Sequence, residues 1–152
     1  MVSVVHRYPA TPERLWRVAT DFSTLAATSR GMVRYRGLPP GPVREGTVVE
    51  WDVSLFGLAP WQPYKVAVVA MDERRLRFET QEMGAGIRRW NHEMQVEADG
   101  DGSLLIETIA IEAETAAMTP IARAFAWAMY QRRHPARLRL LDDSDPWGML
   151  PA

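Results

Sequence analysis

The hydrophobic pattern of the chain changes its period, and this change restricts the fold more than any other sequence feature. From Met32 to Ala113, apolar and polar residues alternate with the period of about two that is typical of half-buried β-strands. From Thr119-Pro120 to about Leu141 the period is about 3.6, which predicts one long helix with an apolar stripe. Pro135 predicts a kink or a local break in this helix. The stripe must pack on the sheet that the strands form.

Turn-forming residues divide the alternating region into strands joined by hairpins. Strands are predicted at residues 2–8, 32–37, 46–56, 64–71, 76–82, 88–96 and 104–113. Thr11 as N-cap and Pro12 in the first helical position predict a short helix through Asp21, and a second helix follows at Phe22–Thr28. This order predicts an α+β helix-grip fold, with a curved antiparallel sheet of about six to seven strands wrapped around the long C-terminal helix. A cavity is expected between them.

Length and composition exclude several classes of protein. The 152 residues predict one domain over residues 1–141 and an irregular acidic tail over residues 142–152. A formal net charge of −1 argues against general nucleic-acid binding, which depends on neutralising phosphates. The absence of cysteine excludes a disulfide framework, a thiolate nucleophile and a Cys-based zinc site. Because we find no signal-peptide core and no run of membrane-spanning length, we expect a cytoplasmic protein without membrane insertion.

The predicted strand at residues 88–96 has an unusually polar inner face. Its odd-numbered side chains are uniformly polar and belong in water: Arg89, Asn91, Glu93, Gln95 and, just beyond, Glu97. The inward face therefore consists of Arg88, Trp90, His92, Met94 and Val96. Polar groups that point into a protein need partners or a ligand. The strand therefore predicts the wall of a pocket.

The turn at residues 99–102, Asp-Gly-Asp-Gly, decides which residues of the next strand lie near His92. Three two-residue loops fit this turn, and in each of them Glu107 and Ile109 share the inward face with His92. A loop of residues 99–100 places Glu107 directly opposite His92, and a loop of residues 100–101 places it diagonally within reach. A loop of residues 101–102 moves Glu107 further away. The sequence leaves these three registers open.

A glutamate beside a histidine has three interpretations. The carboxylate can fix the imidazole tautomer and raise its pKa for general acid–base chemistry, which makes His92 and Glu107 catalytic candidates. The pair can instead orient the polar end of a ligand, or it can simply satisfy two buried polar groups. A buried Glu107 without a partner would be protonated.

Large apolar side chains on the same inferred surface either line a pocket or fill the core. Their mixture with polar groups favours a pocket, because so many polar groups are costly to satisfy inside a closed core. Arg88 lies either at the pocket mouth, where it would meet an anionic group, or on the surface as an ordinary arginine. The candidate ligand-binding residues are Trp51, Tyr64, Phe78, Thr80, Glu82, Arg88, Trp90, His92, Met94, Glu107, Ile109, Phe125 and Met129.

Other polar clusters predict no site. The three histidines, His6, His92 and His134, have no metal-ligand spacing, so neither a metal site nor a cofactor is predicted. Basic residues near the end of the last helix predict a solvated helix terminus, where the helix dipole favours cations: Arg132, Arg133, His134, Arg137 and Arg139. Trp127 and Trp147 are candidate contacts for a homodimer.

Three stretches resemble the START-like (SRPBCC) superfamily, which includes polyketide cyclases/dehydratases and plant pollen-allergen-type ligand carriers. Residues 10–16, A-T-P-E-R-L-W, are similar to its strand-to-helix signature. Residues 78–82 followed by Trp90-Asn91-His92 resemble the F-x-D-x-Q…G-P-F-x-x-W-x-H stretch of a bacterial ligand-binding subfamily, and residues 103–109 resemble its next strand. Thr80 and Glu82 replace the expected Asp and Gln, and A-G-I at residues 85–87 replaces G-P-F. The resemblance covers roughly residues 2–141.

The resemblance and the inferred pocket lead to three hypotheses of function. The first is binding of a small hydrophobic or amphipathic molecule in the internal cavity, with His92 and Glu107 orienting its polar end. The second is a cyclase- or dehydratase-type enzyme in which the same pair moves a proton on an enolisable carbonyl compound. The third is a protein-interaction module whose cavity is incidental.

Overall fold

A computed structural model describes residues 1–142, and these contain the predicted elements in the predicted order. The elements are β1 (Val2–Tyr8), α1 (Pro12–Ala19), α2 (Phe22–Thr28), β2 (Val33–Arg36), β3 (Val48–Leu55), β4 (Gln62–Asp72), β5 (Arg77–Gly84), β6 (Ile87–Asp99), β7 (Gly102–Ala113), the short 3-10 helix η1 (Ala116–Met118) and α3 (Thr119–Asp142). The predicted tail begins one residue too early, because Asp142 is the last residue of α3. The rest of that tail, residues 143–152, lies outside the described residues.

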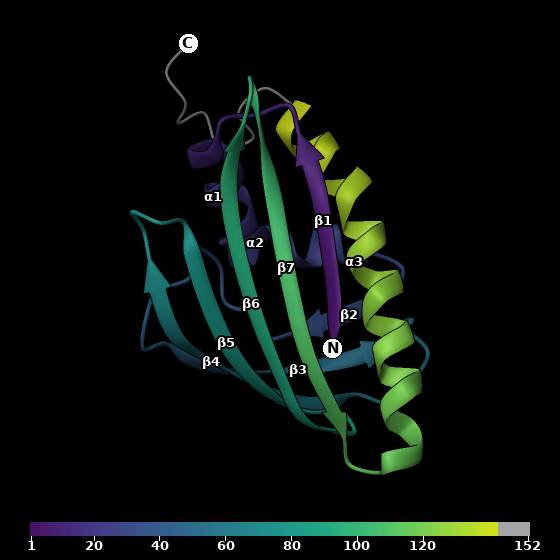
Figure 1. The fold of residues 1–152 in the computed structure, drawn as a ribbon. Coiled ribbons are helices and arrows are strands. Elements are labelled where there is room, and N and C mark those ends of the chain that lie inside the picture. Colours follow the sequence, from purple (N-terminus) through teal and green to yellow (C-terminus); the bar gives the residue numbers. More distant parts are fainter. Residues whose placement is uncertain (143–152) are drawn as a thin grey trace.

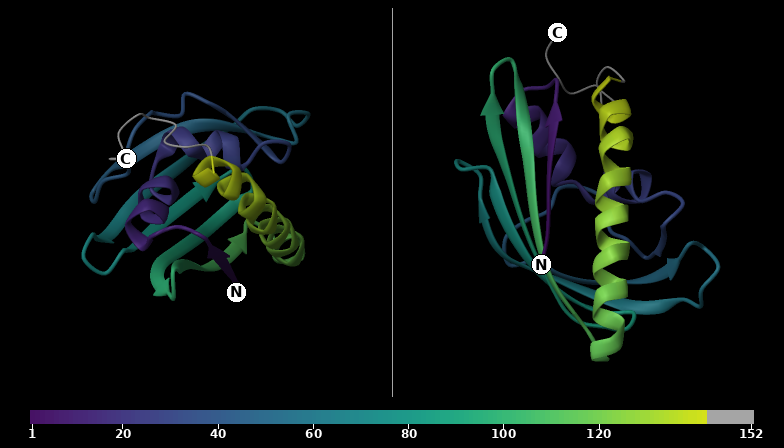
Figure 2. Two further views of the ribbon diagram at one scale, coloured as in Figure 1. Left: turned by 90° about the horizontal axis from the view of Figure 1, so that it is seen from above. Right: turned by 45° about the vertical axis from the view of Figure 1, so that its right-hand side comes forward.

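The seven strands form one antiparallel sheet in the order β1-β7-β6-β5-β4-β3-β2. The sheet curls strongly, and α3 lies on its concave side next to β1 and β7 (Figure 1, Figure 2). The two short helices pack near the C-terminal half of α3. The predicted helix-grip fold is therefore confirmed.

The first short helix begins at Pro12, after the predicted Thr11 cap, but it ends at Ala19 rather than at Asp21, which instead caps the second helix. The Thr11 side chain accepts a hydrogen bond from the Arg14 backbone N–H at 3.3 Å, and Pro12 opens α1. The Asp21 side chain caps α2 in the same way, by accepting from the Ser23 backbone N–H at 2.7 Å. The caps fix the chain direction after β1, so that the apolar face of α1 turns toward the core.

The long helix α3 continues through Pro135 as a single helix of 24 residues, so the predicted break does not occur. Pro135 itself is exposed, whereas Arg133, Arg137 and Leu141 are buried on either side of it. Packing of both halves holds the helix together across the hydrogen bond that proline cannot donate. None of the helices in residues 1–142 combines the length and the apolar character needed to span a membrane.

The β6–β7 hairpin adopts the second of the three possible registers. Asp99 pairs with Gly102, so residues 100–101 form the two-residue loop. Met94 is then opposite Glu107 and Ile109 is opposite His92. Glu107 therefore lies diagonally across from His92, within reach of its side chain.

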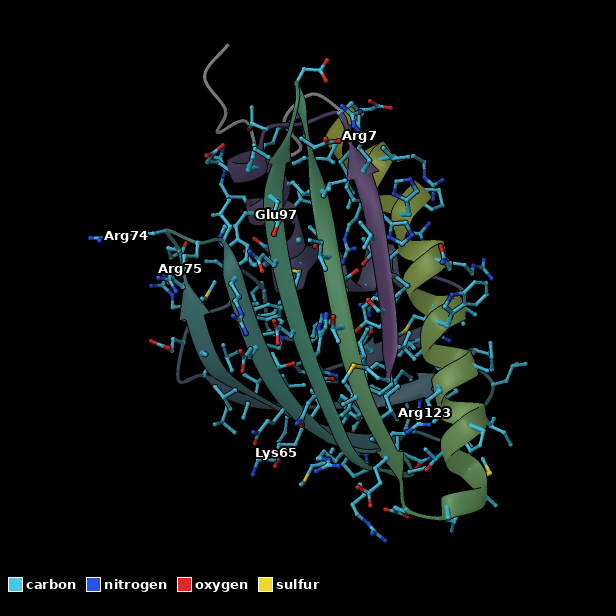
Figure 3. All side chains as sticks on the ribbon, viewed as in Figure 1. Arg7, Lys65, Arg74, Arg75, Glu97 and Arg123 are labelled. Carbon is cyan, nitrogen blue, oxygen red and sulfur yellow. The ribbon has the colours of Figure 1, made fainter. Side chains whose placement is uncertain are left out.

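The convex face of the sheet is polar. Glu97 on β6 and Lys65 on β4 are exposed there, and Arg74 and Arg75 project from the β4–β5 turn (Figure 3). This arrangement confirms the outward assignment of Glu97. Most apolar residues of the strands lie on the opposite, concave face, which is where α3 packs.

Candidate functional site

A cavity of about 470 Å³ lies between the concave face of the sheet and α3. Pockets for small molecules typically measure about 300–1,000 Å³, so the space suits a compact organic molecule. Its wall is mainly apolar and aromatic. The predicted candidates that lie in this wall are Trp51, Tyr64, Phe78, Thr80, Glu82, Trp90, His92, Met94, Phe125 and Met129. Their role in binding stays a prediction.

The prediction that the Arg88 side chain points inward is wrong, because β6 contains a bulge. The pairing of β6 with β7 shifts between Ile87 and Arg89, which inserts one residue and changes the parity of the strand. Ile87 consequently lines the cavity, while Arg88 is exposed and its Nη1 lies 3.1 Å from Glu112 Oε1. The alternative of an ordinary surface arginine describes the structure better.

Glu107 and Ile109 point inward as predicted, but they do not lie in the cavity wall. Both side chains are fully buried. Because α3 packs directly against β1 and β7, the inward side chains in the middle of β7 are covered by the helix. The cavity is lined instead by β2–β6, where the sheet curls away from α3.

Glu107 is the centre of a buried ionic cluster. Arg137 Nη1 donates to Glu107 Oε2 at 3.2 Å, and His92 Nε2 lies 3.3 Å from Glu107 Oε1. The second contact is close but not aligned as a hydrogen bond, so among residues 1–142 both of its atoms lack a hydrogen-bond partner. We therefore treat it as an electrostatic contact.

The charge of Glu107 follows from this cluster. Burial alone would raise the pKa of Glu107, but the positive charge of Arg137 and the contact with His92 outweigh burial and hold the pKa well below its usual range. Glu107 is therefore ionised. Its partners Arg137 and His92 both lie in the cavity wall, so the carboxylate influences the cavity without touching it.

Arg133, one turn before Arg137 on α3, is a second buried arginine in the cavity wall. Its Nη2 donates to Ser29 Oγ at 3.1 Å, and its guanidinium lies 4.6 Å from the centre of the Tyr130 ring. Ser29 Oγ also accepts from the Tyr35 hydroxyl at 3.2 Å. These contacts hold the guanidinium at the edge of the cavity.

The interpretation of the basic cluster as a solvated helix end is wrong for Arg133 and Arg137. Only 6% of Arg133 and 5% of Arg137 is exposed. A signal was present in the sequence, because Arg133 falls on the apolar stripe of the helix and Arg137 follows it on the same face. An arginine on such a stripe points toward the core or a cavity.

Glu82 forms a second polar group on the cavity wall. Its Oε2 accepts from the Tyr64 hydroxyl and its Oε1 accepts from Thr80 Oγ1, both at 2.7 Å. Burial, together with the neighbouring Glu82 carboxylate, raises the pKa of Tyr64 well above its ordinary value. Tyr64 is therefore a neutral donor. Because both Glu82 oxygens already accept a hydrogen bond, this group is satisfied without a ligand.

Four buried polar atoms of the side chains that line the cavity have no hydrogen-bond partner among residues 1–142. They are Trp51 Nε1, Trp90 Nε1, His92 Nε2 and Arg133 Nε. Buried polar groups are usually hydrogen-bonded, so the hydrogen bonding of this wall is incomplete, and of the four atoms His92 Nε2 lies against Glu107 Oε1. Within the same residues, no group of three or more His, Asp or Glu side chains is arranged to hold a metal ion.

The rim of the cavity is apolar. Phe56, Met118 and Ile121 line the cavity yet are about half exposed, which places them at its opening. The ring of Phe56 packs edge-on against that of Phe125, with centroids 5.6 Å apart. The opening thus lies between the β3–β4 loop and the start of α3.

A curled antiparallel sheet that grips a long helix around an apolar cavity defines the class of START-like proteins. The family described as "Polyketide cyclase / dehydrase and lipid transport" matches residues 1–139. The chain belongs to this family.

Solved structures share the fold at low sequence identity. A START superfamily protein from Mycobacterium smegmatis is 14% identical and superposes with a TM-score of 0.66, over 92% of this chain and 97% of that one. A protein from Chromobacterium violaceum is 14% identical with a TM-score of 0.71, over 91% and 94% of the two chains. Major latex-like protein 151 from Panax ginseng is 12% identical with a TM-score of 0.67, over 91% and 95%. A search of curated proteins finds no match.

Proposed function

We propose that this protein binds a small hydrophobic or amphipathic molecule in the cavity between the sheet and α3. His92 orients the polar end of that molecule, and Glu107 holds the His92 ring from behind. The main support is a cavity of about 470 Å³ whose mainly apolar wall includes side chains with buried polar atoms that have no hydrogen-bond partner among residues 1–142. An amphipathic ligand would bind favourably to such a wall, because its apolar part would bury apolar surface and its polar end would complete hydrogen bonds.

Native mass spectrometry of freshly purified protein tests this proposal directly, because a tightly held molecule co-purifies and adds its mass. A second test titrates the protein with anilinonaphthalene sulfonate, whose fluorescence rises in apolar sites. The variant Val66→Phe inserts a ring into the cavity and should weaken dye binding by about tenfold or more.

A matched control separates filling of the cavity from a general effect on the sheet. Val48 lies on the neighbouring strand β3, opposite Ala67, and is 58% exposed. Val48→Phe therefore adds the same ring outside the cavity and should leave dye binding unchanged. Equal dye affinity of the two variants would contradict binding in this cavity.

A second candidate is a cyclase- or dehydratase-type enzyme, and the distance of 3.3 Å between His92 Nε2 and Glu107 Oε1 favours it. In this role His92 would take a proton from the carbon next to an enolisable carbonyl and return it elsewhere on the same compound, while Glu107 holds the ring. The family description includes both cyclases/dehydrases and lipid transport.

The two candidates differ in the fate of the ligand. If the protein only binds, His92→Ala weakens affinity and the recovered compound stays the same. If it catalyses, the wild type converts a polyketide precursor and His92→Ala lowers the rate by about 10²–10⁴-fold. Absence of both a recovered compound and dye binding would instead favour the interaction-module hypothesis.

A further inference from the structure

We infer that Arg133 is the anion-binding residue of the cavity, so that the ligand is an apolar molecule with one acidic group, in the simplest case a carboxylate. This inference rests on the proposed function and specifies its ligand class. It follows from the contacts, the charge and the geometry of the Arg133 side chain.

The guanidinium of Arg133 is buried and held in place, yet its hydrogen bonding is incomplete. Nη2 donates to Ser29 Oγ and lies 3.7 Å from Met129 Sδ, a weak acceptor. Nε is buried and has no hydrogen-bond partner within residues 1–142. A guanidinium has five N–H donors, so a side chain of this type retains several for a molecule in the cavity.

The charge of Arg133 also lacks a partner, in contrast to that of Arg137. Arg137 is paired with Glu107 at 3.2 Å, whereas no carboxylate of residues 1–142 lies within 4.0 Å of the Arg133 guanidinium. Within the described part of the chain, the hydrogen-bond and ring contacts of Arg133 are a hydroxyl, a thioether and the face of the Tyr130 ring, all of them neutral. Arginine keeps its charge in proteins, and a buried charge without a counter-charge in contact is unfavourable; Glu107, which is paired with Arg137, acts on Arg133 only from beyond 4.0 Å. An anionic ligand group would supply that counter-charge.

The geometry specifies a planar acid. The Nε and Nη donors of arginine form a fork that matches the two oxygens of a carboxylate. Stacking on Tyr130 and the bond to Ser29 fix the plane of this fork beside the cavity. Glu82, a carboxylate in the same wall, already accepts hydrogen bonds from Tyr64 and Thr80 and has no donor to offer an anion. The acidic end is therefore directed to Arg133 and the apolar body to the remaining wall.

Lauric acid and methyl laurate form a probe pair that differs mainly in the anionic charge. Isothermal titration near neutral pH should show that the wild type binds laurate about tenfold to a hundredfold more tightly than the ester. Arg133→Met should remove this preference by weakening laurate binding alone. Arg133→Lys, which keeps the charge but not the fork, should retain part of the preference.

Arg123 supplies the control, because it is an exposed arginine on the same helix (Figure 3). Arg123→Gln should leave both affinities unchanged. Urea unfolding of the ligand-free Arg133→Met variant tests whether Arg133 has a structural role. If Arg133 stabilises the fold, the variant is less stable than the wild type. If Arg133 is an unpaired buried charge, its replacement by methionine leaves the stability equal or higher.

The outcomes separate the inference from the proposed function. Equal affinity of the wild type for laurate and methyl laurate overturns the anion site but leaves ligand binding in the cavity supported. An acid preference that survives in Arg133→Met also overturns it. If the wild type binds neither probe, both the inference and the proposed function are rejected. The comparison of laurate and methyl laurate binding to the wild type tests the inference even if a variant fails to fold.

Discussion

Removing the charge of Glu107 should leave Arg137 as a buried cation without its partner. The two side chains are 3.2 Å apart and almost completely buried. At an effective dielectric constant of about 20, two unit charges at this distance attract each other by about 5 kcal/mol. Breaking a buried ion pair on one side typically costs about 3–5 kcal/mol. Glu107→Met and Arg137→Met should each lower the free energy of unfolding by this amount, and the melting temperature by about 6–20 °C.

The double variant tests the reasoning more sharply than either single one. With methionine at both positions no charge of the pair remains buried, and such replacements are often neutral or stabilising. Urea unfolding of all four proteins gives the coupling free energy. We expect a coupling of about 3 kcal/mol or more, with the double variant within about 1–2 kcal/mol of the wild type. The idea that this buried ion pair stabilises the fold would be refuted by either of two results. The first is that the losses of unfolding free energy in the two single variants add up in the double variant. The second is that each single variant loses less than about 1 kcal/mol.

The two single variants should also differ in their pH dependence. In the wild type the pKa of Glu107 is depressed, so its contribution is complete above the unfolded value of about 4.3 and is lost as the pH falls further. In Arg137→Met, burial of Glu107 is opposed only by His92 and Arg133, so the pKa of Glu107 rises relative to that in the wild type and the neutral form is favoured as the pH falls. The cost of Arg137→Met should therefore shrink between neutral pH and about pH 4.3, while that of Glu107→Met stays constant.

Three further predictions concern stability. The pKa of His134 is lowered by burial and by neighbouring His6, so the free energy of unfolding should decrease as the pH falls through about 6.5. In urea unfolding, the His134→Gln variant should lose less stability over this pH range than the wild type. An equal loss in both proteins would contradict this prediction. Gly84 has φ +122°, and an added Cβ would collide with the backbone oxygen of Pro63 in β4, so Gly84→Ala should cost at least about 2 kcal/mol. Gly86→Ala, at φ +82° with open space around it, should cost only about 1 kcal/mol, and similar melting temperatures of the two variants would count against the steric argument. Pro135→Ala restores a helical donor at an exposed site and should raise the free energy of unfolding by about 1–3 kcal/mol, whereas no gain would mean that α3 already accommodates the proline.

Most of the fold could be predicted because local signals agree with it. The period of two along the strands, the Thr11 cap and the apolar stripe of α3 are all properties of short segments. Each of them depends on neighbouring residues alone, so no knowledge of distant contacts is needed. The inward face at Trp90, His92 and Met94 was predicted for the same reason.

Part of the site could not be predicted, because small local changes alter which side chains meet. A single bulge turned Arg88 outward and brought Ile87 into the cavity wall. The three registers of the β6–β7 hairpin have similar turn residues, and the period of two cannot distinguish among them. Only the pairing of β6 with β7 places Glu107 diagonally from His92.

The sequence by itself determined the order of the elements, the helix-grip fold and the polar inner face of β6. The tertiary structure decided how that face is used. Because α3 lies against β1 and β7, it covers Glu107 and leaves the cavity over β2–β6. The same packing buries Arg133 and Arg137, which in sequence resemble a solvated helix end. Burial depends on elements far apart in the chain, and it is burial that turns an ordinary arginine into a candidate ligand-binding residue.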